Sequence, residues 1–510
     1  MSSRIVDTPD PVKVGHTGLV SLDGIGLGVA DVVRLADGSA RPVPGTEATK
    51  RVTESWDAAR QIAATGRVYG RSTGVGANRN EDVPTEAAAE HGLRLLRSHA
   101  GAIGEELPAR QVRAMLAVRA NQLLAGGAGL RPTVVTALCE ALESGAYPVV
   151  NEFGSVGTGD IAALAQVGLA LAGEHPWRGA DGAAAGAPEP QLLDNNDALA
   201  FISSNALTLG QAALALHELR GLIEATQVVG ALSLLAVDGS HEAYAAPVHA
   251  ARPHRGSVEV ARRMRQLIGA EDRPTPPLGR IQDPYGFRCL PQIHGPAQDA
   301  ADTLEEVLAI EINAAAENPL ISPQDMAAYH HGGFYQAQLA LALDHFRLAL
   351  TQVARLSTSR LSTLNEPAFT RLRPFLADQE PASSGVMILE YAAGAALGDL
   401  RAFSAPASLG HAVLSRGVEE QASFASLAAR QTLRACGAYR LVVGCELVAA
   451  VRALRQRDLR PDPDLPVGRA LELAEAVLEE DPADRPLTGD VTAAAALLDR
   501  FTDIWRGSEA

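Results

Sequence analysis

A glycine-rich segment in the first third of the chain has the composition of a reactive backbone loop. Residues 154–161 read Gly-Ser-Val-Gly-Thr-Gly-Asp-Ile. Ordinary side chains are poor electrophiles, so an enzyme that must attack an amine or an electron-rich ring needs a cofactor or a modified backbone. Glycines allow the backbone compression that brings a peptide nitrogen onto a nearby carbonyl, and a hydroxyl-bearing residue between them can lose water. The segment is therefore either the precursor of an electrophile or an unmodified turn that caps a helix starting near Asp160.

A tyrosine in a second glycine-rich segment is a candidate for proton transfer. Residues 68–76 read Val-Tyr-Gly-Arg-Ser-Thr-Gly-Val-Gly, so Tyr69 is followed by three glycines and can reach into a cleft. A phenol is a poor base unless a neighbouring cation or buried donor lowers its pKa. Arg71 is a candidate for such a cation. The alternative is that Tyr69 is an ordinary aromatic residue of a turn.

Four segments in this order and spacing resemble the aromatic amino-acid ammonia-lyases and aminomutases, the family of the histidine, phenylalanine and tyrosine lyases. Besides the two glycine-rich segments, residues 282–292 read Gln-Asp-Pro-Tyr-Gly-Phe-Arg-Cys-Leu-Pro-Gln, close to the family's Gln-Asp-Pro-Tyr-Ser-Leu-Arg-Cys-x-Pro-Gln. Residues 311–320 match its Glu-x-Asn-x-x-x-Asp-Asn-Pro-Leu. The resemblance runs from about Gly24 to about Arg460.

The chain departs from the family where that family makes its electrophile. The family loop reads Gly-Ser-Val-Gly-Ala-Ser-Gly-Asp, and its Ala-Ser-Gly triad cyclises and loses water to become a methylidene-imidazolone group, MIO. Here the loop is one residue shorter, and the best match to the triad is Gly157, Thr158 and Gly159. The extra methyl group of threonine would crowd the electrophilic carbon. We therefore expect this segment to stay an unmodified peptide, so that the protein has no MIO cofactor.

The resemblance also implies roles for individual side chains. In the family, the residue matching Tyr69 takes the β-proton of the substrate, and the one matching Arg288 clamps its carboxylate, a task suited to a planar, two-pronged donor. The family asparagine that contacts the electrophile and the substrate amine aligns directly with Ser203, or with Asn205 after a two-residue shift. The remaining positions implied to line the site are His99, Gln282, Tyr285, Asn318, Phe334 and Glu419.

Composition excludes several other classes of protein. The net charge of −16 and the lack of any Lys/Arg-rich run argue against a nucleic-acid partner. The four cysteines have no metal-ligand spacing, so no metal site is expected, and so few cysteines suit a reducing cytoplasm. No signal pattern and no apolar run of about 18 residues predicts a membrane association.

Apolar spacing predicts a mainly α-helical protein. Residues 1–50 are expected to form strands and loops, and helices are expected over 54–64, 86–100 and 108–126. Residues 336–365 and 407–460 lack proline, which predicts long helices that bury best in a bundle. The resemblance implies an ammonia-lyase-like fold, with a loop-rich N-terminal domain, 1–205, and a domain of long and C-terminal helices, 206–510. The resemblance implies a homotetramer.

Three hypotheses of function remain open. The first is a carbon–nitrogen lyase or aminomutase that acts on an aromatic or histidine-like amino acid through an electrophile derived from residues 157–159. The second is an enzyme without MIO that uses Tyr69 and Tyr285 for acid–base work, by elimination, cyclisation or dehydration, on another carboxylated small molecule. The third is a non-catalytic partner of an intact lyase, which would need neither Tyr69 nor Arg288. The clustered departures at one end of the site favour the second.

Overall fold

The computed structural model describes residues 17–179, 186–274 and 280–506, which form two compact units. The first unit comprises residues 1–217, 304–343 and 406–430, and the second comprises 218–303, 344–405 and 431–510. Each unit is assembled from segments far apart in the sequence. This is a different kind of division from the consecutive domains 1–205 and 206–510, which stay a prediction.

The first unit begins with a small βαβ arrangement. Strand β1 (Gly18–Leu22) pairs in parallel with β2 (Ala40–Pro44), and α1 (Val29–Ala36) connects them. The expectation of only strands and loops over residues 1–50 was wrong at α1, where Val29, Val32, Val33 and Ala36 bury one helical face. Two turns of helix are too short to give a clear helical pattern. Residues 1–16 of that prediction lie outside the described residues.

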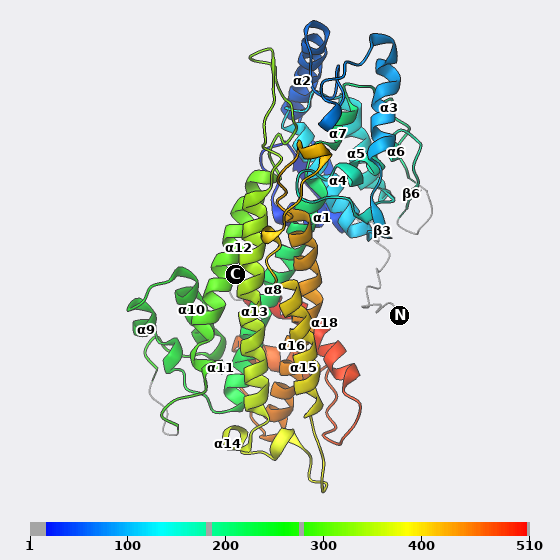
Figure 1. Ribbon diagram of the computed structural model, residues 1–510. Coiled ribbons are helices and arrows are strands. Elements are labelled where there is room, and N and C mark those ends of the chain that lie inside the picture. The colour runs from blue at the N-terminus through cyan, green and yellow to red at the C-terminus, as the bar shows by residue number, and fades with distance from the viewer. Residues whose placement is uncertain (1–16, 180–185, 275–279, 507–510) are drawn as a thin grey trace. The chain divides into compact units, whose positions relative to one another are not determined.

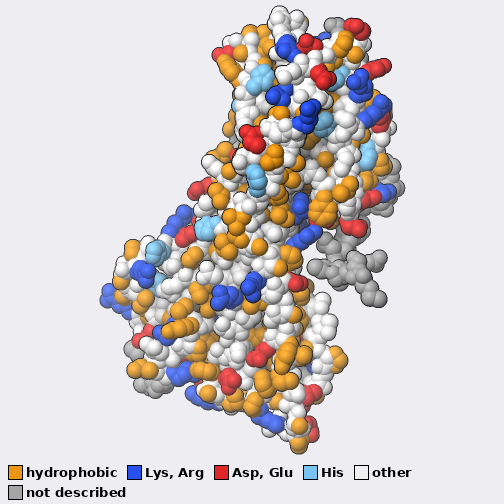
Figure 2. Space-filling model, viewed as in Figure 1, with side chains coloured by type: hydrophobic (Ala, Val, Ile, Leu, Met, Phe, Trp, Pro, Cys, Tyr) orange, Lys and Arg blue, Asp and Glu red, His pale blue; other side chains and the backbone are white. Residues whose placement is uncertain are grey.

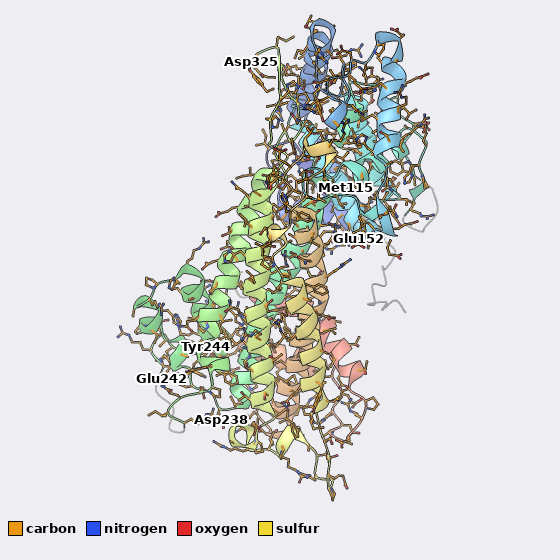
Figure 3. The ribbon with its side chains drawn as sticks, viewed as in Figure 1. Met115, Glu152, Asp238, Glu242, Tyr244 and Asp325 are labelled. Carbon is orange, nitrogen blue, oxygen red and sulfur yellow. The ribbon has the colours of Figure 1, made fainter. Side chains whose placement is uncertain are left out.

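Helices dominate the rest of the first unit, as predicted. The three helices expected over 54–64, 86–100 and 108–126 are present as α2 (Thr46–Thr65), α3 (Ala88–His99) and α4 (Ala109–Leu124). All of α4 from Val112 onward is buried, and Figure 3 shows Met115 in its interior position. The other elements of this unit are α5 (Pro132–Ser144), α6 (Ile161–Leu171), α7 (Ala198–Ile202) and the antiparallel pairs β3 (Ile103–Glu106) with β5 (Asn151–Phe153), β4 (Tyr147–Pro148) with β6 (Trp177–Arg178), and β7 (Leu320–Ser322) with β8 (Ala327–Tyr329).

Long helices make up the core of the second unit. They are the parts within it of α8 (Ala206–Ala236), α12 (Leu290–Glu311), α13 (Ala337–Leu364) and α16 (Ala425–Gln456), together with α15 (Ile388–Phe403). Figure 1 shows α8, α13, α15 and α16 running side by side in this unit. Fully buried Glu446 ties three of them together, because it accepts hydrogen bonds from Ser233, Ser357 and Arg360. The predicted bundle of long helices is thus confirmed.

Shorter elements complete the chain. The remaining α-helices are α9 (Ala246–Ala250), α10 (Arg255–Ile268), α11 (Tyr285–Arg288), α14 (Pro367–Thr370), α17 (Pro466–Glu475) and α18 (Thr488–Arg506). Single 3-10 turns are η1 (Gly76–Asn78), η2 (Thr85–Ala87), η3 (Glu242–Tyr244), η4 (Pro374–Leu376), η5 (Ala407–Leu409) and η6 (Ser415–Gly417).

One long helix begins later than its sequence predicts. Residues 407–460 were expected to be helical throughout, but α16 starts at Ala425. The preceding segment takes left-handed backbone conformations at Ser415, Arg416 and Phe424, with φ of 50°, 57° and 55°. An L-residue adopts such angles at a cost in free energy, so the contacts of this segment must hold it there.

Among the residues that the structure describes, one helical stretch, 198–236, is long and apolar enough to cross a membrane by length and composition. Its most apolar window is entirely buried inside the protein, as in the core helix of a bundle.

Candidate functional site

The glycine-rich loop before α6 is held by hydrogen bonds on both sides of Thr158. Gly157 and Gly159 have φ of 88° and 118°, angles that favour glycine. The Gly157 carbonyl accepts a hydrogen bond of 2.7 Å from Ser423 Oγ, and the Gly159 N–H donates to Asn205 Oδ1 at 3.1 Å. The peptide groups that flank Thr158 are therefore fixed by two separate parts of the chain.

Asp160, the last residue of this loop, bonds to Thr208 and does not cap helix α6, which follows it. Helix α6 begins at Ile161, as the sequence predicts, but the Asp160 carboxylate makes no capping bond to it. It instead accepts hydrogen bonds from Thr208 N at 2.8 Å and Thr208 Oγ1 at 2.9 Å. Burial raises the pKa of Asp160, and the two Thr208 bonds oppose that rise. The carboxylate thus ties the loop to α8.

The structure distinguishes the two candidates for the asparagine position. Asn205 bridges two segments of the site, since it accepts from the Gly159 N–H and donates to the Phe334 carbonyl at 2.8 Å. Ser203 Oγ instead accepts the Asn318 N–H at 3.0 Å. Asn205, which needs the two-residue shift in alignment, is therefore the residue at the loop, and Ser203 positions Asn318.

A buried ion pair between Arg119 and Glu317 lies next to Asn318 in the chain. Arg119 of α4 donates to Glu317 at 2.8 Å and to the Phe201 carbonyl at 2.9 Å, and both charged side chains are almost completely inaccessible to solvent. Burial raises the pKa of Glu317, an effect that the Arg119 charge opposes. Breaking one side of such a pair leaves an uncompensated buried charge, so this contact fixes the backbone next to Asn318.

Tyr69 lies in the same region of the first unit. Its ring contacts that of His330 edge-on, with centroids 6.4 Å apart. Four residues further on, Phe334 is bonded to Asn205 and so reaches the glycine-rich loop. Four residues span at most about 14 Å. A chain of contacts through residues 330–334 therefore links Tyr69 to Asn205 and, through Asn205, to Gly159.

The environment of Tyr69 disfavours its phenolate. Burial raises the pKa of Tyr69, and the nearby Glu419 carboxylate raises it further. The Gly76 N–H, which donates to the Tyr69 oxygen at 2.8 Å, and the Arg79 guanidinium both lower it. The prediction that Arg71 supplies the cation was wrong: Arg71 is buried and donates to the carbonyls of Ala128, Gly129 and Asn196.

Replacing Glu419 with glutamine should lower the pKa of Tyr69. The substitution removes an anion that opposes formation of the phenolate, while an amide of the same size keeps the packing. Ultraviolet titration of the phenols, with Tyr69→Phe as the reference spectrum, measures the change. Glu420→Gln, at an exposed neighbouring position, is the control and should leave the titration unchanged. An unaltered Tyr69 titration in Glu419→Gln would show that the two groups do not interact.

His99 is anchored near the loop on its Nδ1 side. This nitrogen lies 2.8 Å from the Leu95 carbonyl and 3.0 Å from Ser98 Oγ. Three residues further, Ala102 packs on the loop, since a Cβ placed on Gly154 would lie 3.0 Å from its Cβ. Nε2 is then the ring nitrogen available to a ligand, which fits the expected position of His99 beside the substrate.

The predicted carboxylate clamp belongs to the second unit. Arg288 Nε donates to the Asp283 carbonyl at 2.7 Å, and the guanidinium lies 4.8 Å from the centroid of the Tyr285 ring. The two terminal nitrogens make no hydrogen bond with the described part of the chain. Tyr285 is 69% exposed, and Gln282 is exposed as well. The Arg288 guanidinium therefore presents an open fork with the geometry to bind a carboxylate, and its role as the clamp stays a prediction.

Two buried side chains donate hydrogen bonds to the backbone of residues 285–288, which carry Arg288. Tyr244, which Figure 3 shows close to Glu242 in the segment after α8, donates to the Phe287 carbonyl at 3.0 Å. Arg360 donates to the Gly286 carbonyl at 3.3 Å while it pairs with Glu446. A Cβ on Gly286 would lie 2.9 Å from Arg360 Cγ, so the serine of the family motif would crowd this contact.

The loop does not fit the family's Ala-Ser-Gly triad. A Cβ at position 157 would lie 2.2 Å from Ser423 Oγ and 2.8 Å from the backbone nitrogens of Phe424 and Ala425. An alanine therefore has no room there, and the two atoms that ring closure would join, Gly157 C and Gly159 N, belong to peptide groups held by different neighbours. This supports the expectation that residues 157–159 stay unmodified, which remains a prediction.

Gly157→Ala should accordingly destabilise the protein. A left-handed backbone costs an L-residue about 1–2 kcal/mol, and overpacking adds about 1–3 kcal/mol, so the melting temperature should fall by several degrees. The matched control is Gly66→Ala, where a Cβ meets nothing within 4 Å and φ is −161°. Equal melting temperatures for the two variants would contradict the packing of Ser423 on the loop.

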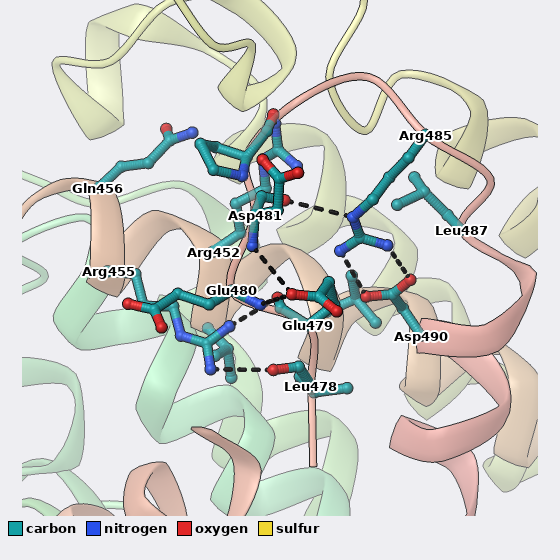
Figure 4. Close-up of a pocket in the computed structure, with 13 residues that line it drawn as sticks. Arg452, Arg455, Gln456, Leu478, Glu479, Glu480, Asp481, Arg485, Leu487 and Asp490 are labelled. Carbon is teal, nitrogen blue, oxygen red and sulfur yellow. Dashed lines mark hydrogen bonds and ion pairs between the residues drawn. The ribbon is translucent and has the colours of Figure 1, made fainter. Parts of the chain in front are cut away.

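A pocket of about 30 Å³ lies in the second unit, lined by residues of α16 and the segment between α17 and α18. Figure 4 shows Arg485 paired with Asp490 and Arg455 bonded to the Leu478 carbonyl. This volume holds about one water molecule, and its arginines are bound within the chain. Across the described ranges, no group of three or more His, Cys, Asp or Glu side chains has a metal-binding arrangement.

Several residues around the candidate site are not predicted from the sequence. Arg79 lowers the pKa of Tyr69, and the His330 ring contacts the Tyr69 ring. Ser415 Oγ accepts the Ala77 N–H at 3.0 Å, and Ser423 Oγ donates to the Gly157 carbonyl of the glycine-rich loop. Ser415 and Ser423 lie some 260–340 residues from their partners in the chain. Only the glycines around the two serines, at 410 and 417, signalled that residues 407–424 were not a simple helix.

The chain is similar to known proteins along most of its length. Residues 27–479 match the family described as aromatic amino acid lyase. The histidine ammonia-lyase of Geobacillus kaustophilus is 35% identical over 450 residues, which are 86% of this chain and 89% of that protein. The crystal structure of histidine ammonia-lyase from Trypanosoma cruzi has a TM-score of 0.88 at 27% identity and covers 96% of this chain and 95% of its own.

A third similar protein has a different activity. It is ergothionase, the ergothioneine-degrading enzyme of Treponema denticola, solved in complex with desmethyl-ergothioneine sulfonic acid. Its TM-score is 0.87 at 25% identity, and the match covers 95% of this chain and 99% of that one. With a family match over most of its length, this chain belongs to the aromatic amino acid lyase family and is a lyase-like enzyme.

Proposed function

We propose that this enzyme lacks MIO and performs acid–base chemistry with Tyr69, by elimination, cyclisation or dehydration, on a carboxylated small molecule. The observation that carries the proposal is the loop itself. Its triad is shortened, Ser423 fills the space of an alanine Cβ at position 157, and the Gly159 N–H is bound to Asn205. Arg288 and Tyr69, which a carboxylated substrate and a proton transfer require, are both retained.

The leaving group decides whether an electrophile is needed. A primary amine departs poorly from carbon, and an electrophile that binds it makes it a better leaving group. A quaternary ammonium group leaves as a neutral tertiary amine and needs no such help. The similar enzyme of Treponema denticola degrades ergothioneine. Ergothioneine is a betaine that carries such a quaternary ammonium group. Elimination of a tertiary amine from a betaine is therefore the reaction we favour.

The substrate-binding groups suit a small carboxylated betaine. The two terminal nitrogens of Arg288, which make no hydrogen bond with the described residues, match the planar geometry of a carboxylate. His99 offers Nε2 as a hydrogen-bond donor or acceptor, and Glu419 offers a carboxylate beside Tyr69. A heteroaromatic ring, as in histidine derivatives, would use these two groups.

A second candidate is a carbon–nitrogen lyase or aminomutase that acts on a histidine-like amino acid through an electrophile formed from residues 157–159. Its support is the 35% identity to a histidine ammonia-lyase over 86% of the chain. Glycine at both flanking positions, with φ of 88° and 118°, leaves the backbone free of steric opposition from side chains.

A direct assay distinguishes these candidates. The purified protein is incubated with L-histidine and, separately, with its N-trimethyl betaine, while released ammonia, released trimethylamine and the absorbance of the new double bond are followed. We expect turnover of the betaine alone. Turnover of L-histidine with release of ammonia would overturn the proposal and establish the second candidate.

We further propose that the enzyme is a homotetramer in the cytoplasm. Helix α15 exposes Ile388 at 57% and Tyr391 at 67%, and near them Gly394 and Gly398 have no neighbour within 4 Å of an added Cβ. Figure 2 shows hydrophobic side chains exposed on the face that carries α13 and α15. An apolar face of small residues suits close helix packing between subunits. The four cysteines are free thiols, which suits a reducing compartment.

A further inference from the structure

Two buried polar side chains lie in the contact between helices α8 and α12 of the second unit. Gln227 of α8 and His294 of α12 are both fully inaccessible to solvent. Across the described part of the chain, neither the amide oxygen and nitrogen of Gln227 nor the two ring nitrogens of His294 have a hydrogen-bond partner. Buried polar atoms are almost always paired, because folding removes their bonds to bulk water. These four atoms therefore need a partner that the described residues do not supply.

Two contacts set the register of these helices. A Cβ on Gly230 would lie 2.9 Å from Leu290 Cδ1, and Arg220 pairs with Asp302 at 3.0 Å. The two helices are therefore antiparallel, and these four positions lie on the surfaces that face each other. The two buried polar side chains come three residues before the first contact on α8 and four residues after it on α12. Such spacings keep a residue on the same helical face, so the two side chains face each other at the same level.

The charge beside this pair keeps the imidazole neutral. Arg360 approaches the same contact, since a Cβ on Gly230 would lie 3.6 Å from its Cζ. Burial lowers the pKa of His294 well below its usual value, and the Arg360 guanidinium lowers it further. A neutral imidazole has one N–H donor and one acceptor nitrogen, and the Gln227 amide has donors on its nitrogen and an acceptor oxygen. The pair thus presents donors and acceptors together.

We propose that the α8–α12 contact binds an internal water molecule that bridges Gln227 and His294. A metal ion satisfies only acceptors, and an anion satisfies only donors. Water donates two hydrogen bonds and accepts two, and buried waters typically make about three of them. The bridge joins α8 to the start of α12, which begins at Leu290, two residues after Arg288. This role is the same whichever reaction the enzyme performs.

A crystal structure of the full chain, at a resolution that shows ordered water, tests the site directly. We expect density for one water molecule within about 3.2 Å of the Gln227 amide and of a His294 ring nitrogen. A contact without water would overturn the proposal, whether the two side chains bond to each other or stay unpaired. Density for an ion at this place would overturn it as well.

Thermal unfolding of two variants with apolar side chains of similar size gives an independent test. If water bridges the pair, Gln227→Met and His294→Leu each remove hydrogen bonds of the water and weaken its hold on the other side chain. Each should lower the melting temperature by about 2 °C or more. The double variant should fall by less than the two single changes together, because they act on one bridge.

A dry contact predicts the opposite sign, because each substitution would then remove an unsatisfied polar group. The matched control is Leu232→Met, at a fully buried apolar position of α8, which measures the cost of fitting a methionine into this helix and should be small. A melting temperature that rises in Gln227→Met or His294→Leu, or stays level with this control, would contradict the bridging water.

Discussion

Tyr69→Phe should lower turnover by about 10² or more while substrate affinity changes little. The substitution removes only the phenolic oxygen, so the ring keeps its edge-on contact with His330 and the loop loses one hydrogen bond, from the Gly76 N–H. Burial and Glu419 raise the pKa of Tyr69. The phenolate is therefore scarce at neutral pH, and the wild-type rate should rise with pH toward the pKa of the phenol.

Steady-state kinetics of the wild type and Tyr69→Phe, from neutral pH toward the pKa of the phenol, test the prediction. The rise in rate at alkaline pH should disappear in Tyr69→Phe, and the residual activity should show no limb from a phenol. A wild-type rate in Tyr69→Phe would remove the proton-transfer role from this residue. Tyr335→Phe is a suitable control, since this tyrosine is 37% exposed and its hydroxyl makes no hydrogen bond within the described residues.

Arg288→Lys should cost about 2 kcal/mol or more in transition-state binding, which is about 30-fold in kcat/KM. A lysine ammonium is a point charge and cannot replace a bidentate fork. It also loses the contact with the Tyr285 ring and the bond to the Asp283 carbonyl that aim the guanidinium. The loss should appear mainly in KM for the carboxylated substrate.

A substrate analogue without the carboxylate tests whether Arg288 acts by binding that group. The amide of the betaine lacks the carboxylate, so wild type and Arg288→Lys should turn it over equally poorly. Arg273→Lys, an exposed position in the same unit, should leave both substrates unaffected. If Arg288→Lys kept wild-type kinetics on the carboxylated substrate, Arg288 would not be the clamp.

Local patterns in the sequence predicted the elements of the fold well. Helix α13 occupies 337–364 where the proline-free span 336–365 predicted it, because its apolar residues recur at helical spacing over eight turns. The same argument failed for residues 407–424. There the backbone takes left-handed angles at Ser415 and Phe424 in order to contact the two glycine-rich loops, and such long-range contacts leave no local pattern.

Each candidate site residue is predicted from its own segment of the sequence, whereas the contacts between segments are not. The roles of Tyr69 and Arg288 rest on such single segments and stay predictions. The cation near Tyr69 is not predictable in this way, because Arg71 turns inward to bind three carbonyls and Arg79 takes the position near the phenol. For a similar reason, the sequence does not show that Asn205, and not Ser203, bonds to the glycine-rich loop. A two-residue difference along the chain depends on the turn between α7 and α8, which sequence spacing does not reveal.

The proposed chemistry depends on residues 157–159 remaining an ordinary peptide. Digestion of the native protein at glutamate residues releases the segment 153–174, which contains the whole loop between Glu152 and Glu174. Mass spectrometry of this segment should give the mass calculated from its sequence. A deficit of two water molecules localised to Gly157, Thr158 and Gly159 would contradict it.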